Sequence, residues 1–234
     1  MELKNEQMEF SEFYCQWQVW QLLTPAERTL LQDNAEFRSY EKNGAIYREG
    51  TRPEFLMCVV RGKVMIRKEG FGGRSQIMRM IKSGEMCGYR AFFAEENYVT
   101  EAVACEPTTI CLVPSHVIQK LIHQNVELAC YFVKLLAVDL GESDVHTVSL
   151  TQKHIRGRLA DSLLFLLQKY GYEPDGKTLN ISLMREDLAN LSNMTTSNAI
   201  RTLSQFATEK IVEIQGRKIK IECEDVLRKI AHLG

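Results

Sequence analysis

Residues 182–221 read SLMREDLANLSNMTTSNAIRTLSQFATEKIVEIQGRKIKI, a pattern of two short helices followed at once by a β-hairpin. Leu188 and Leu191 lie three residues apart, on one face of a helix predicted over 182–191. Asn193 then interrupts the pattern, and asparagine is one of the few non-glycine residues that tolerate a left-handed turn. The spacing therefore predicts a helix-turn-helix.

The second helix of the pair, predicted over about 196–210, has one apolar and one polar face. A threonine at 195 or 196 can cap its start. The face predicted to be buried holds Ala199, Ile200, Leu203, Phe206 and Ala207. The face predicted to be exposed holds Thr196, Ser197, Asn198, Arg201, Thr202 and Gln205. Every side chain on the exposed face can form hydrogen bonds, which is what reading base edges in a DNA major groove requires.

The hairpin is predicted from strands over 211–214 and 219–221, and its turn carries two basic residues that suit phosphates. We predict that Arg201 binds guanine through O6 and N7. The other predicted base contacts are Thr196, Ser197 and Asn198, and the predicted phosphate contacts are Arg185, Thr195, Arg217 and Lys218. A purely structural helix pair without nucleic acid is the alternative interpretation.

The charge of the chain is unevenly distributed. The 234 residues have a net charge of −1 and are 45% hydrophobic, enough for two domains with proper cores. Residues 1–150 hold 16 Lys and Arg against 20 Asp and Glu, whereas residues 151–234 hold 13 against 10. The basic excess lies in the half that carries the helix pair, as DNA binding requires. We therefore expect an effector domain over 1–150 and a DNA-binding domain over 151–234.

No apolar run approaches the roughly 20 residues that span a membrane, and residues 1–6 do not resemble a signal peptide. A cytoplasmic protein without a membrane partner is expected. There is no Cys-x-x-Cys pair and no cysteine–histidine cluster with metal-ligand spacing, so no metal or cofactor is predicted. The seven cysteines are expected to be mostly buried free thiols: Cys15, Cys58, Cys87, Cys105, Cys111, Cys130 and Cys223.

The first half of the chain shows short alternating or apolar segments separated by glycine turns. Such spacing predicts a small barrel or sandwich. The predicted strands cover residues 55–60, 63–67, 75–81, 102–104 and 108–113.

Residues 43–50, 55–62 and 83–88 resemble the cyclic-nucleotide-binding β-roll of the CRP/FNR family of bacterial transcription regulators. The resemblance covers about residues 20–230. It implies an α+β protein with an N-terminal double-stranded β-helix (β-roll), a long dimerisation helix and a C-terminal winged helix-turn-helix. The partners it implies are double-stranded DNA, a second copy of the chain, RNA polymerase and a small-molecule effector.

Within such a roll, residues 88–102 look like the phosphate-binding cassette. The family's ribose-binding Glu is replaced by Tyr89, and its phosphate-clamping Arg-Ser pair by Val99 and Thr100. Losing the arginine removes a charge-assisted bond worth roughly 1.5–3 kcal/mol, so an effector other than cyclic AMP is expected. The candidate effector pocket comprises Gly88, Tyr89, Arg90, Ala91, Val99, Thr100 and Tyr131. Plain core packing of Tyr89, Phe92 and Phe93 is the alternative.

Other branches of the family fit this sequence less well. An N-terminal iron–sulfur cluster is excluded because Cys15 is the only cysteine in the first 50 residues. His116 and His123 could be haem ligands by location alone, and a solvated or capping role is the better interpretation. In the recognition helix, Thr196 and Ser197 stand where the family carries a Glu and an Arg, so a different operator sequence is expected.

A helix predicted over about 126–148 is apolar around most of its circumference, as expected of a helix covered on two sides. Its predicted dimer seam is formed by Leu128, Tyr131, Leu135, Val138 and Val145. A buried helix in a monomer is the alternative.

We predict a homodimeric, sequence-specific DNA-binding regulator gated by an effector. The competing hypothesis is a ligand-binding or protein-interaction module that has lost DNA binding. An enzyme is disfavoured, because the sequence has no glycine-rich phosphate loop, metal pair or nucleophile beside a base.

Overall fold

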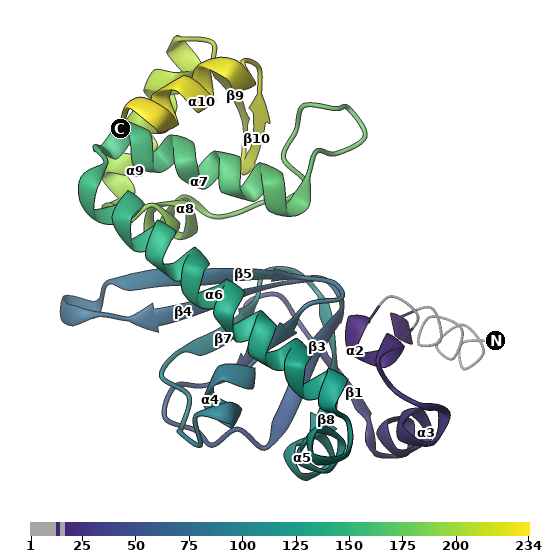
Figure 1. Ribbon diagram of the computed structural model, residues 1–234. Coiled ribbons are helices and arrows are strands. Elements are labelled where there is room, and N and C mark those ends of the chain that lie inside the picture. The colour runs from purple at the N-terminus through teal and green to yellow at the C-terminus, as the bar shows by residue number, and fades with distance from the viewer. Residues whose placement is uncertain (1–12, 15–16) are drawn as a thin grey trace. The chain divides into compact units, whose positions relative to one another are not determined.

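The computed structural model describes residues 13–14 and 17–234, and they form two compact units (Figure 1). One unit holds the described residues up to Lys68 together with Arg79–Leu140. The other holds Glu69–Met78 and Gly141–Gly234. The domain boundary expected at residue 150 stays a prediction.

The first unit is built on two four-stranded sheets, as the β-roll prediction required. Their strand orders are β1-β8-β3-β6 and β2-β7-β4-β5. All five predicted strands are present, each extended by one or two residues at an end. The strands are β1 Glu36–Tyr40, β2 Ala45–Tyr47, β3 Phe55–Arg61, β4 Lys63–Glu69, β5 Ser75–Lys82, β6 Met86–Cys87, β7 Glu101–Ala104 and β8 Thr108–Pro114.

Strand β3 is buried on both faces, which explains its uninterrupted apolar sequence. Met57 and Val59 pack in the core inside the roll, whereas Leu56 and Cys58 pack in a second core under the helices. The turn after β3 requires glycine, because Gly62 has a φ of +96° and an added Cβ would lie 2.4 Å from Thr108 Oγ1. The roll therefore has two cores that share one strand.

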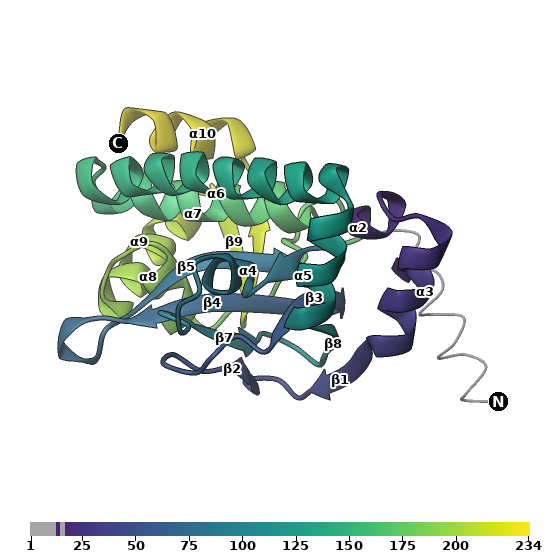
Figure 2. The ribbon, with the colours of Figure 1, turned by 60° about the horizontal axis from the view of Figure 1, so that its bottom comes forward.

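Helices cover the outer face of β3 and β8; Figure 2 shows α3 and α5 beside these strands. The helices are α2 Gln18–Gln21, α3 Pro25–Asn34, α4 Tyr89–Phe93, α5 Ser115–Gln124 and α6 Val126–Gln152, with a 3₁₀ turn η1 over Phe71–Gly73. Thr24 and Glu27 form a capping box at α3. The Asn125 side-chain amide donates to the Leu22 carbonyl and to Glu27, both at 3.0 Å, and so fixes the entry of α6.

Helix α6 is longer than predicted and ends at Gln152 instead of about residue 148. The next helix, α7, begins at Ile155, with His154 in an extended conformation before it. Among the described residues, no single helix is long and apolar enough to cross a membrane. Helices α5 and α6 reach the required length and apolar character only when taken together, and the chain bends by 113° between them.

The second unit contains α7 Ile155–Tyr170, α8 Arg185–Leu191, α9 Thr196–Thr208, β9 Val212–Gln215, β10 Lys218–Ile221 and α10 Glu224–Leu233. Helix α7 packs against α8, α9 and α10. Strands β9 and β10 are antiparallel, with Lys220 opposite Glu213, and Thr178 forms an isolated bridge to Lys220 at the free edge. We call the β9–β10 hairpin the wing.

Most of the described cysteines are buried free thiols, as predicted. Cys58, Cys87, Cys105 and Cys111 are buried free thiols, but Cys130 and Cys223 are exposed. Cys130 lies on α6, and Cys223 is the N-cap of α10. Cys15 lies outside the described residues. No group of three or more potential metal ligands occurs in the part of the chain that the structure describes.

Candidate nucleic-acid interface and effector pocket

The turn of the helix-turn-helix forms from local signals. Asn193 adopts the expected left-handed conformation, with a φ of +48°. Thr195 is the N-cap of α9, and its hydroxyl accepts a hydrogen bond from the Asn198 backbone N–H at 3.3 Å. Helix α8 begins at Arg185, three residues later than predicted. The Met184 N–H donates to the Asp187 carboxylate, which stops the helix at that point.

Helix α9 buries a stripe formed by Ala199, Thr202, Leu203 and Phe206. Two sequence assignments are corrected here: Thr202 is 3% exposed, whereas Ile200 is 47% exposed. The reason is geometric, because Thr202 lies inside the stripe at i+3 from Ala199, and Ile200 lies about 100° round the helix. Ala207 is half-buried.

The predicted base-reading residues share the solvent side of α9. Thr196, Ser197 and Arg201 are exposed, and Asn198 is half-buried. Arg201 donates from Nη2 to Asn198 Oδ1 at 3.1 Å, which orients the guanidinium along the helix surface. The exposed Ile200 is a residue that the sequence interpretation missed. The face therefore combines hydrogen-bonding groups with one apolar side chain.

Of the predicted phosphate contacts, Arg185 is already engaged within the unit. Its Nη2 donates to the Gly216 carbonyl in the wing turn at 2.6 Å, and its Nη1 is buried without a partner among the described residues. Burial lowers the pKa of Arg185. Arg217 is exposed in the wing turn and makes no ion pair within the described part of the chain. Arg185 thus joins the start of α8 to the wing.

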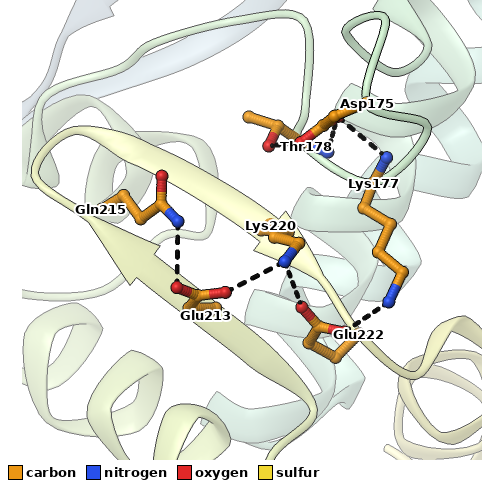
Figure 3. Close-up of polar contacts among 7 residues, drawn as sticks. All are labelled: Asp175, Lys177, Thr178, Glu213, Gln215, Lys220 and Glu222. Atoms are coloured by element: carbon orange, nitrogen blue, oxygen red, sulfur yellow. Dashed lines mark hydrogen bonds and ion pairs between the residues drawn. The ribbon is translucent and has the colours of Figure 1, made fainter.

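The lysines of the wing are paired with carboxylates. Lys218 Nζ lies 2.7 Å from Glu173 Oε2, in the loop after α7. Lys220 lies 3.1 Å from Glu213 and 2.9 Å from Glu222, which also binds Lys177 at 2.7 Å (Figure 3). The basic wing expected from the sequence is therefore a surface of alternating charges.

The cassette of the β-roll is filled by aromatic side chains of the roll itself. Gly88 has a φ of +82°, and an added Cβ would lie 2.6 Å from Met57 Cε and 3.0 Å from the Tyr98 hydroxyl. The Tyr98 ring stacks on Tyr47 with centroids 3.9 Å apart. The Tyr47 hydroxyl lies 3.5 Å from Thr100 Oγ1. This packing leaves Tyr98 directly beneath the glycine that opens the cassette.

Tyr89 points away from that stack, toward α6. Its hydroxyl donates to the Asp139 carboxylate, and Arg79 of β5 donates to the same carboxylate oxygen. Arg79 Nη1 also lies 3.3 Å from the Tyr89 hydroxyl. Burial, followed by the hydrogen bond to Asp139 and the charge of that carboxylate, raises the pKa of Tyr89, so the phenol stays protonated as a donor. Sequence analysis missed Arg79 and Asp139; the signal was one arginine within the largely apolar strand 75–82.

The structure does not bring all seven predicted pocket residues together. Ala91 packs inside the roll, whereas Tyr89 and Tyr131 belong to the core under the helices. Arg90 is exposed and pairs with Glu96 at 3.2 Å, and Val99 is 44% exposed. A separate surface cavity of about 150 Å³ is lined by Phe92, Phe93, Glu95, Gln119, Ile122 and His123. His123 Nδ1 lies 2.7 Å from the Gln119 carbonyl, in keeping with the capping role expected of it.

The predicted dimer seam on α6 needs one correction. Leu128 is completely buried within its own chain and is not accessible to a second copy. Tyr131 and Leu135 are half-buried, whereas Val138 and Val145 are 49% and 73% exposed. Further exposed apolar residues on the helix are Val126, Val133, Leu140 and Val148.

Residues 37–125 match the family model for the cyclic nucleotide-binding domain, and residues 157–230 match that for the Crp-like helix-turn-helix domain. The chain is 26% identical over 202 residues to the anaerobic regulatory protein of Bacillus subtilis, covering 85% of each. It is 20% identical to the CRP-like cAMP-activated global transcriptional regulator of Mycobacterium tuberculosis, covering 91% of this chain and 96% of that one.

Among solved structures, FixK2 from Bradyrhizobium japonicum superposes with a TM-score of 0.72 and is 25% identical. The match covers 84% of this chain and 96% of FixK2. It extends across both the β-roll and the helix-turn-helix.

Proposed function

Because the chain belongs to the CRP/FNR family of DNA-binding transcription regulators, we propose that it works as a cytoplasmic homodimer reading a two-fold symmetric operator. The observation that carries this proposal is the exposed polar face of α9, on a helix whose other face is fully packed. A rigid helix with such a face can enter a major groove. Two copies must present their α9 helices about 34 Å apart to reach successive grooves.

The dimer proposal is supported by α6. Val138 and Val145 are exposed and lie seven residues apart on this helix, and apolar side chains of this size favour burial against a partner helix. The seam proposed after the correction is Tyr131, Leu135, Val138 and Val145. Sedimentation of the purified chain tests it: a dimer is expected, and Val138→Glu should shift it toward monomer. A wild-type monomer at micromolar concentration would overturn it.

The base contacts proposed are Arg201 to guanine and Thr196, Ser197 and Asn198 to neighbouring base edges. Ile200 adds an exposed apolar group suited to the C5 methyl of thymine. Thr195, Arg217 and Lys218 are the proposed phosphate contacts. Arg185 is proposed to contact phosphate only through the N–H groups not used by the wing turn. RNA polymerase is the proposed protein partner of the DNA-bound dimer.

We further propose that an effector other than cyclic AMP acts at the cassette formed by Gly88, Tyr89, Arg90, Ala91, Val99 and Thr100, with Tyr131 at its margin. A ligand that displaces Tyr98 from beneath Gly88 would shift α4 and loosen the bond of Tyr89 to Asp139 on α6. Only a ligand that binds the two arrangements with different affinity can change their populations. Calorimetry with cyclic AMP should show no binding, and a cyclic AMP dissociation constant in the micromolar range would contradict the proposal.

The experiment that tests the whole proposal is selection of bound duplexes from a random pool by the purified protein. A palindrome is expected, and Arg201→Ala should lose enrichment at one base of each half-site. No enrichment, with or without small molecules extracted from cells, would overturn DNA reading. The second candidate is a module that no longer binds DNA, and the pairing of the wing lysines favours it. Salt-dependent retention on random DNA would exclude that candidate.

A further inference from the structure

The two lysines of the wing, Lys218 and Lys220, pair with carboxylates in different parts of the unit. Lys220 lies in the middle of β10, is half-buried and contacts Glu213 and Glu222 at once. Together with Gln215 and Lys177 these residues form the ladder of Figure 3. Lys218 differs from them. It stands at the start of β10, beside the wing turn, and pairs with Glu173, which lies outside the wing.

The main chain of Glu173 is fixed by hydrogen bonds within its loop. Its backbone N–H donates to the Thr178 carbonyl at 2.7 Å, and its carbonyl accepts from the Gly176 N–H at 2.9 Å. Asp175 closes the same loop by accepting from the Thr178 backbone and hydroxyl. The Glu173 side chain is 29% exposed, against 51% for Lys218. The main chain of Glu173 is therefore fixed by its loop, and its side chain is less exposed than the longer side chain of Lys218.

We propose that Glu173 limits the sequence-independent affinity of the protein for DNA by competing with DNA phosphate for Lys218. This inference rests on the proposed DNA-binding function. A surface ion pair is weak, so Lys218 can leave Glu173 for a phosphate. When Lys218 binds a phosphate, the Glu173 carboxylate remains near the phosphate backbone and repels it. The competition reduces the affinity that is independent of sequence and leaves discrimination to the bases that α9 reads.

The test compares Glu173→Gln with the wild-type full chain on the selected operator and on a scrambled duplex, over a series of salt concentrations. The variant should bind both duplexes about 3-fold to 10-fold more tightly at low salt. The slope of log affinity against log salt should become steeper by about 1, because one more phosphate contact forms. The preference for operator over scrambled DNA should stay the same, because the added phosphate contact does not depend on sequence.

Two further variants separate competition from a general charge effect. Glu49→Gln removes the same charge from a pair of equal length, 2.7 Å to Lys68, in the other unit, and should leave DNA affinity unchanged. In the Lys218→Gln background, Glu173→Gln should give no tightening. Tightening by Glu49→Gln, or persistent tightening without Lys218, would overturn the proposal.

Failure of this inference can be told from failure of the function on which it rests. If the wild-type chain binds DNA and Glu173→Gln has the same affinity and salt slope, only the role of Glu173 is overturned. If the wild-type chain binds no duplex at any salt concentration, the proposed function and this inference both fail. Thermal melting of each variant shows whether the loop that holds residue 173 is still folded.

Discussion

The cassette of the β-roll and the exposed face of α9 both carry polar side chains that the sequence predicts to bind something. In the cassette, Tyr89 is buried and its hydroxyl is already satisfied by the Asp139 carboxylate. On α9, Ser197 and Arg201 remain exposed. A buried polar group must be paired within the fold, whereas an exposed one can wait for a ligand.

The difference also concerns rigidity. The cassette glycine is enclosed by Met57 and Tyr98, so any ligand there must first move side chains. The α9 face needs no such movement, because it is already fixed by the cap at Thr195 and the packing of Phe206. We therefore expect substitutions in the cassette to act on folding and substitutions on α9 to act on DNA recognition.

The largest effect is expected from a methyl group at Gly88. Gly88→Ala must accept a left-handed φ and a contact of 2.6 Å with Met57, at a cost to the free energy of unfolding of about 3 kcal/mol. Gly216→Ala in the wing turn has a similar φ of +60° but open space, so about 1–2 kcal/mol is expected. For Gly88→Ala, the loss is measured by urea denaturation followed through the fluorescence of Trp17 and Trp20. For Gly216→Ala, it is measured by urea denaturation followed through far-ultraviolet circular dichroism. Equal losses would mean that the cassette is not tightly packed.

The next effect concerns α9. Arg201→Ala should weaken operator binding by about 1–3 kcal/mol and relax the choice of base at one position of each half-site. Binding to scrambled DNA should change much less, and folding stability should be unchanged because Arg201 is exposed. Titration of both duplexes by fluorescence anisotropy provides the measurement. An equal loss on both duplexes would make Arg201 a phosphate contact.

Much of the second unit could be predicted because its signals are local. The turn at Asn193, the cap at Thr195 and the wing turn at Gly216 each depend on neighbours within a few residues. The errors at Ile200 and Thr202 arose at the border of a helical stripe, where one residue step moves a side chain by about 100°. The strands of the roll were equally visible, because alternation and glycine turns are local patterns too.

The cassette could not be predicted in the same way, since its contacts join distant parts of the chain. Tyr89 and Asp139 are 50 residues apart, and Glu173 and Lys218 are 45 apart. Nothing in the sequence around Tyr89 or Glu173 indicates which distant residue each of them contacts. Thr24 and Glu27 are a different case: their Thr-Pro-Ala-Glu pattern is a capping box that sequence inspection could have found.

A smaller effect is expected from the link between the cassette and α6. Tyr89→Phe removes a hydroxyl that donates to the partly buried Asp139 carboxylate, and should reduce the free energy of unfolding by about 1–2 kcal/mol. The matched control is Tyr47→Phe, whose hydroxyl has only a neutral partner at 3.5 Å and should matter less. Tryptophan fluorescence in urea again reports on this unit. If Tyr47→Phe costs as much as Tyr89→Phe, the charged bond to Asp139 is not what holds the cassette to α6.

The smallest effect is a pH dependence in the second unit. Hydrogen bonds from the Thr178 hydroxyl, the Thr178 N–H and the Lys177 N–H lower the pKa of Asp175 to about 2 from its ordinary 3.8 (Figure 3). Because the pKa is lower in the folded state, the unfolded chain takes up this proton first as the pH falls. Asp175 therefore stabilises the fold above about pH 4, and this contribution is lost between pH 4 and pH 2.

Proton titration of the Asp175 carboxyl by NMR should give a midpoint near 2 in the wild-type chain. Thr178→Val, which removes the strongest of the three donors, should raise that midpoint toward the ordinary value. A wild-type midpoint close to 3.8 would mean that the loop carrying Glu173 is not held by Asp175 in solution.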